Sequence, residues 1–89
     1  MQIIKQVILK NSSGLHIRPA TTIVRLLRNK RSRVFFMHKK MRVDAKSIMG
    51  LLTLLAKKNA KITIFVEGSD AKQVMDELVE AFDKCFEGI

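Results

Sequence analysis

The spacing of apolar residues constrains the fold of this 89-residue chain more than any other feature. In some segments apolar residues recur at every second position, as in a strand. In others they recur at every third or fourth position, as on one face of a helix. The two-residue spacing predicts strands at 2–9, 33–37, 41–43 and 62–66. Helical stripes fall between and after these strands, so the expected element order is β-α-β-β-α-β-α. We therefore expect an α+β fold, an open-faced sandwich in which three helices cover one face of a four-stranded antiparallel sheet.

The three helical stripes begin and end at recognisable signals. The first helix begins at His16, and its apolar residues stop within 29–32. Ser47 is a strong N-cap for a short second helix. Gly68-Ser69-Asp70 is expected to form a turn and to cap the third helix. The stripe residues are Ala20, Ile23, Val24 and Leu27 in the first helix, and Ala71, Val74, Met75, Leu78, Val79, Phe82 and Phe86 in the third.

Two features of the strands stay open at this point. Ile4 and Ile8 share one face of the first strand, and on a solvent-facing side they would need cover, for example from long Lys side chains. The turn His38-Lys39-Lys40 contains no glycine, so a two-residue type I′ turn would be strained there. Phe35 and Phe36 are consecutive in a strand and therefore point to opposite faces.

Composition limits the class of protein. Hydrophobic residues make up 47% of the chain, which suffices for one modest core, so we expect residues 1–89 to form a single domain. No apolar run reaches the roughly 18–20 residues of a membrane span, and residues 1–10 lack the apolar block of a signal peptide. The single cysteine, Cys85, cannot form an internal disulfide, which fits a cytoplasmic location. His16 and His38 are far apart and no Cys/His cluster has metal-ligand spacing, so no metal and no cofactor is expected.

The formal net charge of +9 favours anionic partners. Nucleic acid, an acidic protein and lipid headgroups would all satisfy it, and charge alone does not choose among them. A surface that merely keeps the protein in solution is the simpler alternative.

The candidate functional residues lie in the segment Gly14-Leu15-His16-Ile17-Arg18-Pro19-Ala20. It places His16 where a helix exposes its first free N–H groups and its positive end, a position that favours an anion. That end disfavours a positive charge on the ring, so one imidazole nitrogen keeps its lone pair and can accept a phosphoryl group. Arg18 offers a planar fork of donors for phosphate oxygens. Alternatively, His16 is an exposed residue near a cap and Arg18 is a solvated side chain.

These residues do not stand alone. The segment from Gly14 to Thr21, followed by Lys46-Ser47-Ile48-Met49-Gly50 and by Gly68-Ser69-Asp70, closely resembles the HPr family over nearly the whole chain. HPr proteins are the histidine-containing phosphocarriers of the bacterial phosphoenolpyruvate-dependent sugar phosphotransferase system, and the derived element order is also that family's order.

The resemblance implies a role for each matching residue. His16 would be the phosphorylated histidine, modified on Nδ1, and Arg18 would stabilise the phosphoryl group. Ser47 would be a regulatory serine, which an HPr kinase/phosphorylase phosphorylates in some bacteria. The implied partners are enzyme I upstream and the EIIA domains of sugar permeases downstream, which dock on an apolar surface formed by Ile48, Met49 and Leu52. The basic first helix, with Arg25 and Arg28, suits an acidic enzyme I surface.

The chain also departs from the family pattern. Ile17 stands where a small alanine is usual, and its β-branched side chain is expected to restrict phosphoryl access or the approach of a partner. Leu55 stands where many members have glycine, so we expect a bulkier rim of the site. The hairpin lacks its usual glycine, and a net charge of +9 exceeds the near-neutral or acidic balance common in the family.

Three hypotheses follow from these residues. The first is a monomeric phosphocarrier that uses His16, an intermediate of phosphoryl transfer and not an enzyme that turns over by itself. The second is a regulatory HPr paralogue whose phosphorylation state at Ser47 signals to other proteins. The third and most remote is a small nucleic-acid-binding domain, motivated by the basic runs at 25–33 and 39–42.

Overall fold

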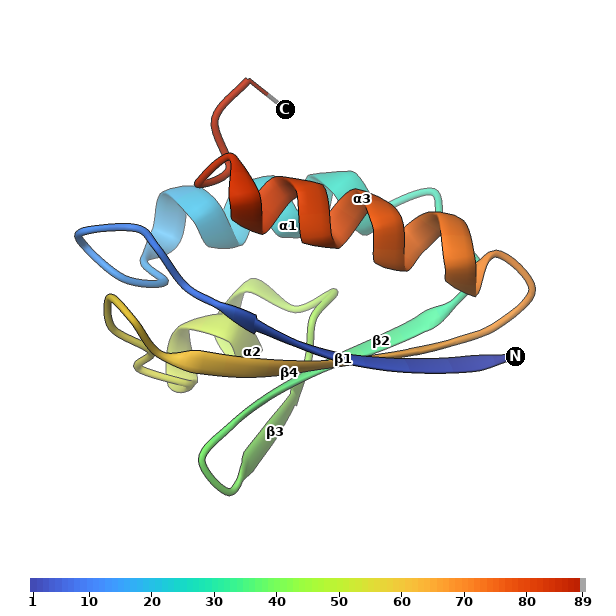
Figure 1. The fold of residues 1–89 in the computed structure, drawn as a ribbon, viewed down its shortest axis with the longest axis horizontal. Helices are drawn as coiled ribbons and strands as arrows, with labels where there is room; N and C mark the ends of the chain where they lie inside the picture. Colours follow the sequence, from blue (N-terminus) through green and yellow to red (C-terminus); the bar gives the residue numbers. More distant parts are fainter. Residues whose placement is uncertain (89) are drawn as a thin grey trace.

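The structure, a computed structural model, describes residues 1–88 and has the element order that the apolar spacing predicts (Figure 1). The strands and helices have the following bounds: β1 (Gln2–Ile8), α1 (Ile17–Leu27), β2 (Arg33–His38), β3 (Met41–Asp44), α2 (Ile48–Thr53), β4 (Lys61–Glu67) and α3 (Ala71–Asp83). No helix among these residues is both long enough and apolar enough to cross a membrane.

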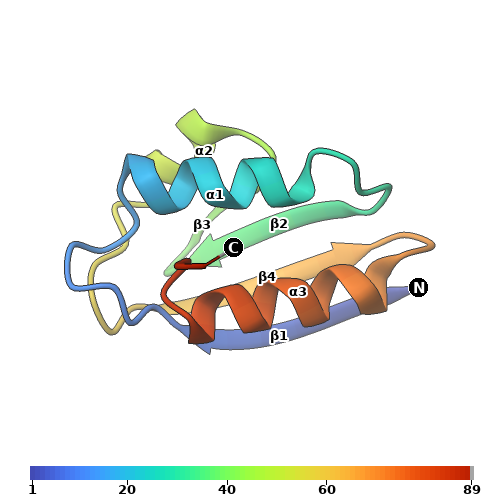
Figure 2. The same ribbon diagram turned by 90° about the horizontal axis from the view of Figure 1, so that it is seen from above.

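The four strands form one antiparallel sheet in the order β1-β4-β2-β3. Helices α1 and α3 lie side by side over one face of this sheet, and α2 lies next to α1 and β3 (Figure 2). The opposite face carries no helix. The predicted open-faced α+β sandwich is therefore confirmed.

The core lies between the apolar face of the sheet and the apolar stripes of the helices. Ile62, Ile64 and Val66 alternate along β4 and are completely buried, as the strand pattern predicts. The stripes of α1 and α3 close over them, with Ile23 and Leu78 fully buried. Phe36 is also fully buried, and its ring lies 5.7 Å from that of Phe82.

The other face of the sheet is open to solvent. Ile4 is 53% exposed there, and Ile8 is directly paired with Lys61 of β4. Phe35 points to this face as well and is half-buried. The predicted division of Phe35 and Phe36 between two faces is thus confirmed.

The β2–β3 hairpin does not form a type I′ turn, although one of its turn residues still has a positive φ. His38 pairs with Met41, so Lys39 and Lys40 are the two turn residues. Only Lys39 has a positive φ, of 57°. A type I′ turn needs positive φ at both residues, whereas a type II′ turn needs it only at the first.

Two helix ends differ from the sequence expectation. α1 ends at Leu27, before the predicted 29–32, because Arg28 N–H and Lys30 N–H donate to carbonyls only three residues back. α3 ends at Asp83, so Phe86 is not on that helix. Cys85 and Phe86 both have left-handed φ, and this reversal still buries Phe86 against Phe82.

Asp70 corrects a third expectation. It occupies the N-cap position of α3, but its carboxylate makes no cap hydrogen bond within that helix. It instead accepts from the Ser32 hydroxyl and from the backbone N–H groups of Arg31 and Ser32, at 2.8 and 2.9 Å for the two N–H groups. The hydroxyl of Ser32 and the N–H of Arg31 lower the pKa of Asp70 to about 2. Asp70 therefore ties α3 to the loop before β2.

We expect Gly14→Ala to destabilise the fold by more than about 2 kcal/mol. Gly14 has a φ of +71°, and an added Cβ would lie 2.4 Å from the carbonyl oxygen of Ala56. The left-handed conformation alone costs roughly 1–2 kcal/mol for an alanine, and the clash adds to it. Urea unfolding of Gly14→Ala and of the control Gly88→Ala measures this. Gly88 has a similar φ of +70° with no atom within 4 Å, so equal effects of the two variants would contradict the role of the close contact.

We expect Asp70 to make stability depend on acid. Its pKa in the folded state is about 2, against 3.8 as the reference value, so the folded state binds its proton less readily than the unfolded state. The stabilisation is fully present above about pH 4 and is lost as the pH falls towards 2. Asp70→Asn should lower stability at pH 7 and flatten its decline between pH 4 and 2 in thermal melts. Asp76→Asn, on the exposed side of α3, is the control, and an identical pH profile for both variants would exclude this role.

Candidate functional site

His16 occupies the N-cap of α1. Its backbone is extended, with φ −95° and ψ −169°, and its carbonyl accepts from Ala20 N–H at 3.1 Å. The imidazole makes no cap hydrogen bond and is half-buried, so its nitrogens are not consumed by the helix. The N–H groups of Ile17 and Arg18 lie in the first turn, where no intrahelical acceptor reaches them, and Pro19 has none. The first turn contains no acidic residue.

The loop before α1 is held in place by the segment that follows α2. Leu15 N–H donates to Ala56 C=O at 2.9 Å, and Gly14 packs against the same peptide. Leu15 is buried, which anchors the loop in the core next to His16. The helix start is therefore fixed relative to the end of α2.

His16 and Arg18 line two adjoining hollows, of about 110 and 380 Å³. Ser12, Ser13 and Lys10 line the larger one and supply hydroxyl and ammonium donors. Arg18 is exposed at the edge of the site. The arrangement combines an unengaged imidazole with hydrogen-bond donors and positive charge, which suits a transferable phosphoryl group.

Sequence reasoning missed the contribution of the C-terminal segment. The reversal after α3 brings Cys85 and Glu87 to both hollows beside His16. Asn11 Nδ2 holds this segment by donating to Cys85 C=O at 3.0 Å. The left-handed residues that make the reversal are Cys85 and Phe86, and neither is a glycine. No sequence signal marks this turn.

Ser47 caps α2 as the sequence predicts. The Ser47 hydroxyl accepts a hydrogen bond from Gly50 N–H at 3.1 Å, and the backbone N–H of Ser47 donates one to Asp44 C=O at 3.1 Å. The nearby Lys46 ammonium donates to Lys30 C=O at 3.0 Å. These bonds fix the N-terminal end of α2 against its surroundings.

The expected apolar docking residues on α2 differ in exposure. Met49 is 71% exposed, whereas Ile48 and Leu52 are half-buried and pack partly on the core. Ile17 and Leu55 are also exposed, at 63% and 78%. The hydrogen bond from Leu15 N–H to Ala56 C=O joins the two segments that carry these residues. Leu55 immediately precedes Ala56, and Ile17 lies two residues after Leu15.

Arg25 lies on the exposed surface of α1, and Arg28 is exposed at its C-cap. Arg25 is seven residues, or two turns, beyond Arg18, so both lie on one side of the helix. Neither residue forms an ion pair within the described part of the chain. They extend the positive charge of the His16 site along α1.

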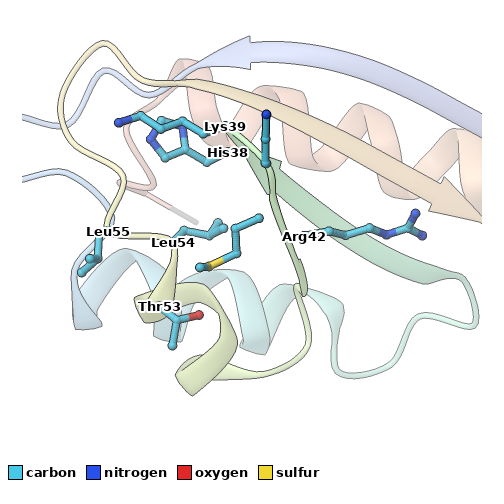
Figure 3. Close-up of a pocket in the computed structure, with 8 residues that line it drawn as sticks. His38, Lys39, Arg42, Thr53, Leu54 and Leu55 are labelled. Carbon is cyan, nitrogen blue, oxygen red and sulfur yellow. The ribbon is translucent and has the colours of Figure 1, made fainter.

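A larger cleft, of about 710 Å³, lies away from this site (Figure 3). It separates the β2–β3 hairpin from the C-terminal end of α2, and His38, Leu54 and Leu55 line it. Arg42 is directed away from the two leucines in this view. The cleft shares no lining residue with the hollows around His16.

Comparisons with known proteins agree on one family. Residues 3–84 match the family described as "PTS HPr component phosphorylation site". The phosphocarrier protein HPr of Chlamydia muridarum is 38% identical over 88% of this chain and 75% of its own length. The HPr-like protein Crh of Halalkalibacterium halodurans is 36% identical over 90% of this chain and 95% of its own length. The crystal structure of HPr-C-His from Thermoanaerobacter tengcongensis superposes with a TM-score of 0.91 at 28% identity and covers 98% of both chains.

We expect Ser47→Ala to destabilise the protein by about 1 kcal/mol, because it leaves Gly50 N–H without its cap. Ser47→Asn should recover most of this stability, since asparagine is an equally good N-cap. Urea unfolding of both variants measures the difference, with exposed Ser69→Ala as the control. A loss no larger in Ser47→Ala than in Ser69→Ala would show that the cap does not stabilise α2.

Proposed function

This chain belongs to the HPr family of the phosphotransferase system, and from that premise we propose that it accepts a phosphoryl group on His16 and passes it on. The observation that carries the proposal is the unengaged imidazole at the N-cap of α1. The group would come from enzyme I and go to EIIA domains of sugar permeases, in the cytoplasm. The protein would act as a monomeric carrier.

The transfer step needs a nucleophile and stabilisation of the phosphoryl oxygens. A ring nitrogen of His16 attacks phosphorus, and the new N–P bond forms as the bond to the donor breaks. Arg18 and the free N–H groups of the first turn face the added negative charge. Each charge–helix interaction of this kind contributes roughly 0.3–1 kcal/mol at an exposed site. The imidazole later leaves readily, so the group can move to the next acceptor.

The partners would dock on the surface around this site. Met49, with the half-buried Ile48 and Leu52, offers an apolar contact whose methionine adapts to more than one partner. Arg25 and Arg28 would meet an acidic partner surface and speed its capture. The exposed Ile17 and Leu55 would enlarge the apolar area that a partner covers.

Ser47 supports a regulatory function as a second candidate, favoured by the similarity to the HPr-like protein Crh. A phosphate on its hydroxyl would lie at the N-terminus of α2, where negative charge is stabilised. It would also add charge beside Met49 and so weaken apolar docking. In this case an HPr kinase/phosphorylase would phosphorylate Ser47.

We expect incubation with enzyme I and radiolabelled phosphoenolpyruvate to give a label that acid removes. His16→Ala should abolish the label, and His38→Ala, which changes the other histidine, should retain it. Circular dichroism of both variants checks that they fold. A fully labelled His16→Ala protein would refute the carrier proposal.

A parallel incubation with radiolabelled ATP and an HPr kinase tests the second candidate. An acid-stable label that appears only with ATP and an HPr kinase, and that Ser47→Ala removes, would support the regulatory function. If enzyme I and phosphoenolpyruvate also gave no label, the regulatory function would replace the phosphocarrier function.

A further inference from the structure

Most of the acidic residues of this protein are concentrated at one helix, α3. Six of the eight acidic residues lie on α3 or next to its ends: Asp70, Asp76, Glu77, Glu80, Asp83 and Glu87. The other two are already engaged, since Glu67 pairs with Arg33 at 2.6 Å and Asp44 accepts from Lys46 N–H at 2.8 Å. Near the β2–β3 hairpin, the open face of the sheet therefore carries one exposed carboxylate without a cationic partner among the described residues, Asp44, which lies opposite Phe35.

Positive charge gathers at this end of the sheet. The exposed cations come from the hairpin, from the chain between α2 and β4, and from the first residue of β4: Lys39, Lys40, Arg42, Lys57, Lys58 and Lys61. None of them has an acidic partner within residues 1–88. The hairpin and the start of β4 are held together, because His38 Nδ1 lies 3.3 Å from Lys61 C=O. A polyanion would meet several unpaired cations here at once.

The open face also carries a stacked aromatic group. Phe35 of β2 is paired directly with Phe65 of β4, and both side chains point away from the helices. The guanidinium of Arg42 lies over both rings, 4.3 Å from the centre of Phe35 and 4.8 Å from that of Phe65. Arg42 itself is exposed, so the outer side of its planar group faces solvent. A guanidinium plane backed by aromatic rings is a surface on which a nucleobase stacks.

A hollow of about 570 Å³ lies further along the same face, and Met37, which lines it, is the strand partner of Arg42. Gln6, Thr63 and Asn59 line it with amide and hydroxyl groups, and Lys39 and Lys61 lie at the same hollow. Thr63 lies two residues before Phe65 on the same face of β4. Amides and hydroxyls can donate to and accept from the edges of a base, while the lysines can reach phosphates.

We propose that the open face of the sheet binds single-stranded nucleic acid. Lys39, Lys40 and Lys61 contact phosphates, a base stacks on Arg42, and the hollow on the same face takes base edges. A single strand fits better than a duplex because its bases are free to stack. An acidic protein segment would pair with the lysines but would leave the Arg42 stack and the hollow without a ligand. A second copy of this chain is repelled, because both copies carry a net charge of +9.

The charge contribution is tested by fluorescence anisotropy with a labelled 12-nucleotide oligouridine. Three phosphate contacts predict a slope of about −2 for log K against log salt concentration. Lys39→Ala/Lys40→Ala/Lys61→Ala should lose at least tenfold in affinity at low salt and most of the slope. Arg31→Ala/Lys72→Ala/Lys84→Ala removes the same charge elsewhere and should retain most of the binding. Equal losses in the two triple variants would overturn the proposal.

The stacking contribution is tested with the charge kept constant. Phe65→Leu and Arg42→Lys should each weaken binding roughly tenfold without changing the salt slope. An abasic oligonucleotide of the same length should bind wild-type protein comparably weakly, and this measurement does not depend on the folding of a variant. His16→Ala should bind oligouridine normally, so this result is independent of the phosphocarrier function.

Three outcomes would overturn the assignment to single strands. Binding of a 12-base-pair duplex or of the abasic strand as tightly as oligouridine would remove the role of the bases. Binding of polyglutamate as tightly as oligouridine, unaffected by Phe65→Leu, would assign this face to an acidic protein segment. No rise in the anisotropy of oligouridine on titration with wild-type protein at 50 mM salt would exclude the site altogether.

Discussion

The backbone contact between the loop before α1 and the segment after α2 determines the geometry of the candidate site. Leu15 N–H donates to Ala56 C=O, and Gly14 lies too close to that peptide for any side chain. This contact fixes where α1 begins and therefore where its free N–H groups and His16 point. It also places the end of α2 beside that helix start, as the proposed docking of one partner on both would require.

The layered fold gives the two faces of the protein different chemistry. Burial of the stripes of α1 and α3 against the sheet uses one face completely, and the site around His16 forms at the end of that layer. The other face keeps Phe35, Phe65 and Arg42 at the surface. Because α3 and its ends hold most of the carboxylates, the positive charge of the chain is expressed mainly on α1 and around the hairpin. The proposed phosphoryl-transfer site and the proposed polyanion-binding surface therefore lie on different parts of one fold.

Sequence patterns predicted the fold well where the signal is local. Alternation in β4 and the stripe of α1 report burial directly, because side-chain direction follows the backbone period. The Ser47 cap was predictable for the same reason, since its hydroxyl bonds to an N–H only three residues away. Asp70 was misread as a cap because its carboxylate has a partner 38 residues away in Ser32, and no local rule ranks such a distant partner.

The sequence by itself determined the order of the elements, the position of His16 at a helix start and the excess of positive charge. Only the tertiary structure decided that Cys85 and Glu87 border His16, and that Phe65 joins Phe35 beneath Arg42. The features that the sequence determined depend on the order of the residues and on the period of the backbone, and both can be read directly from the sequence. The features that the tertiary structure decided depend on strand register and on a reversal at non-glycine residues, which packing imposes after the chain has folded.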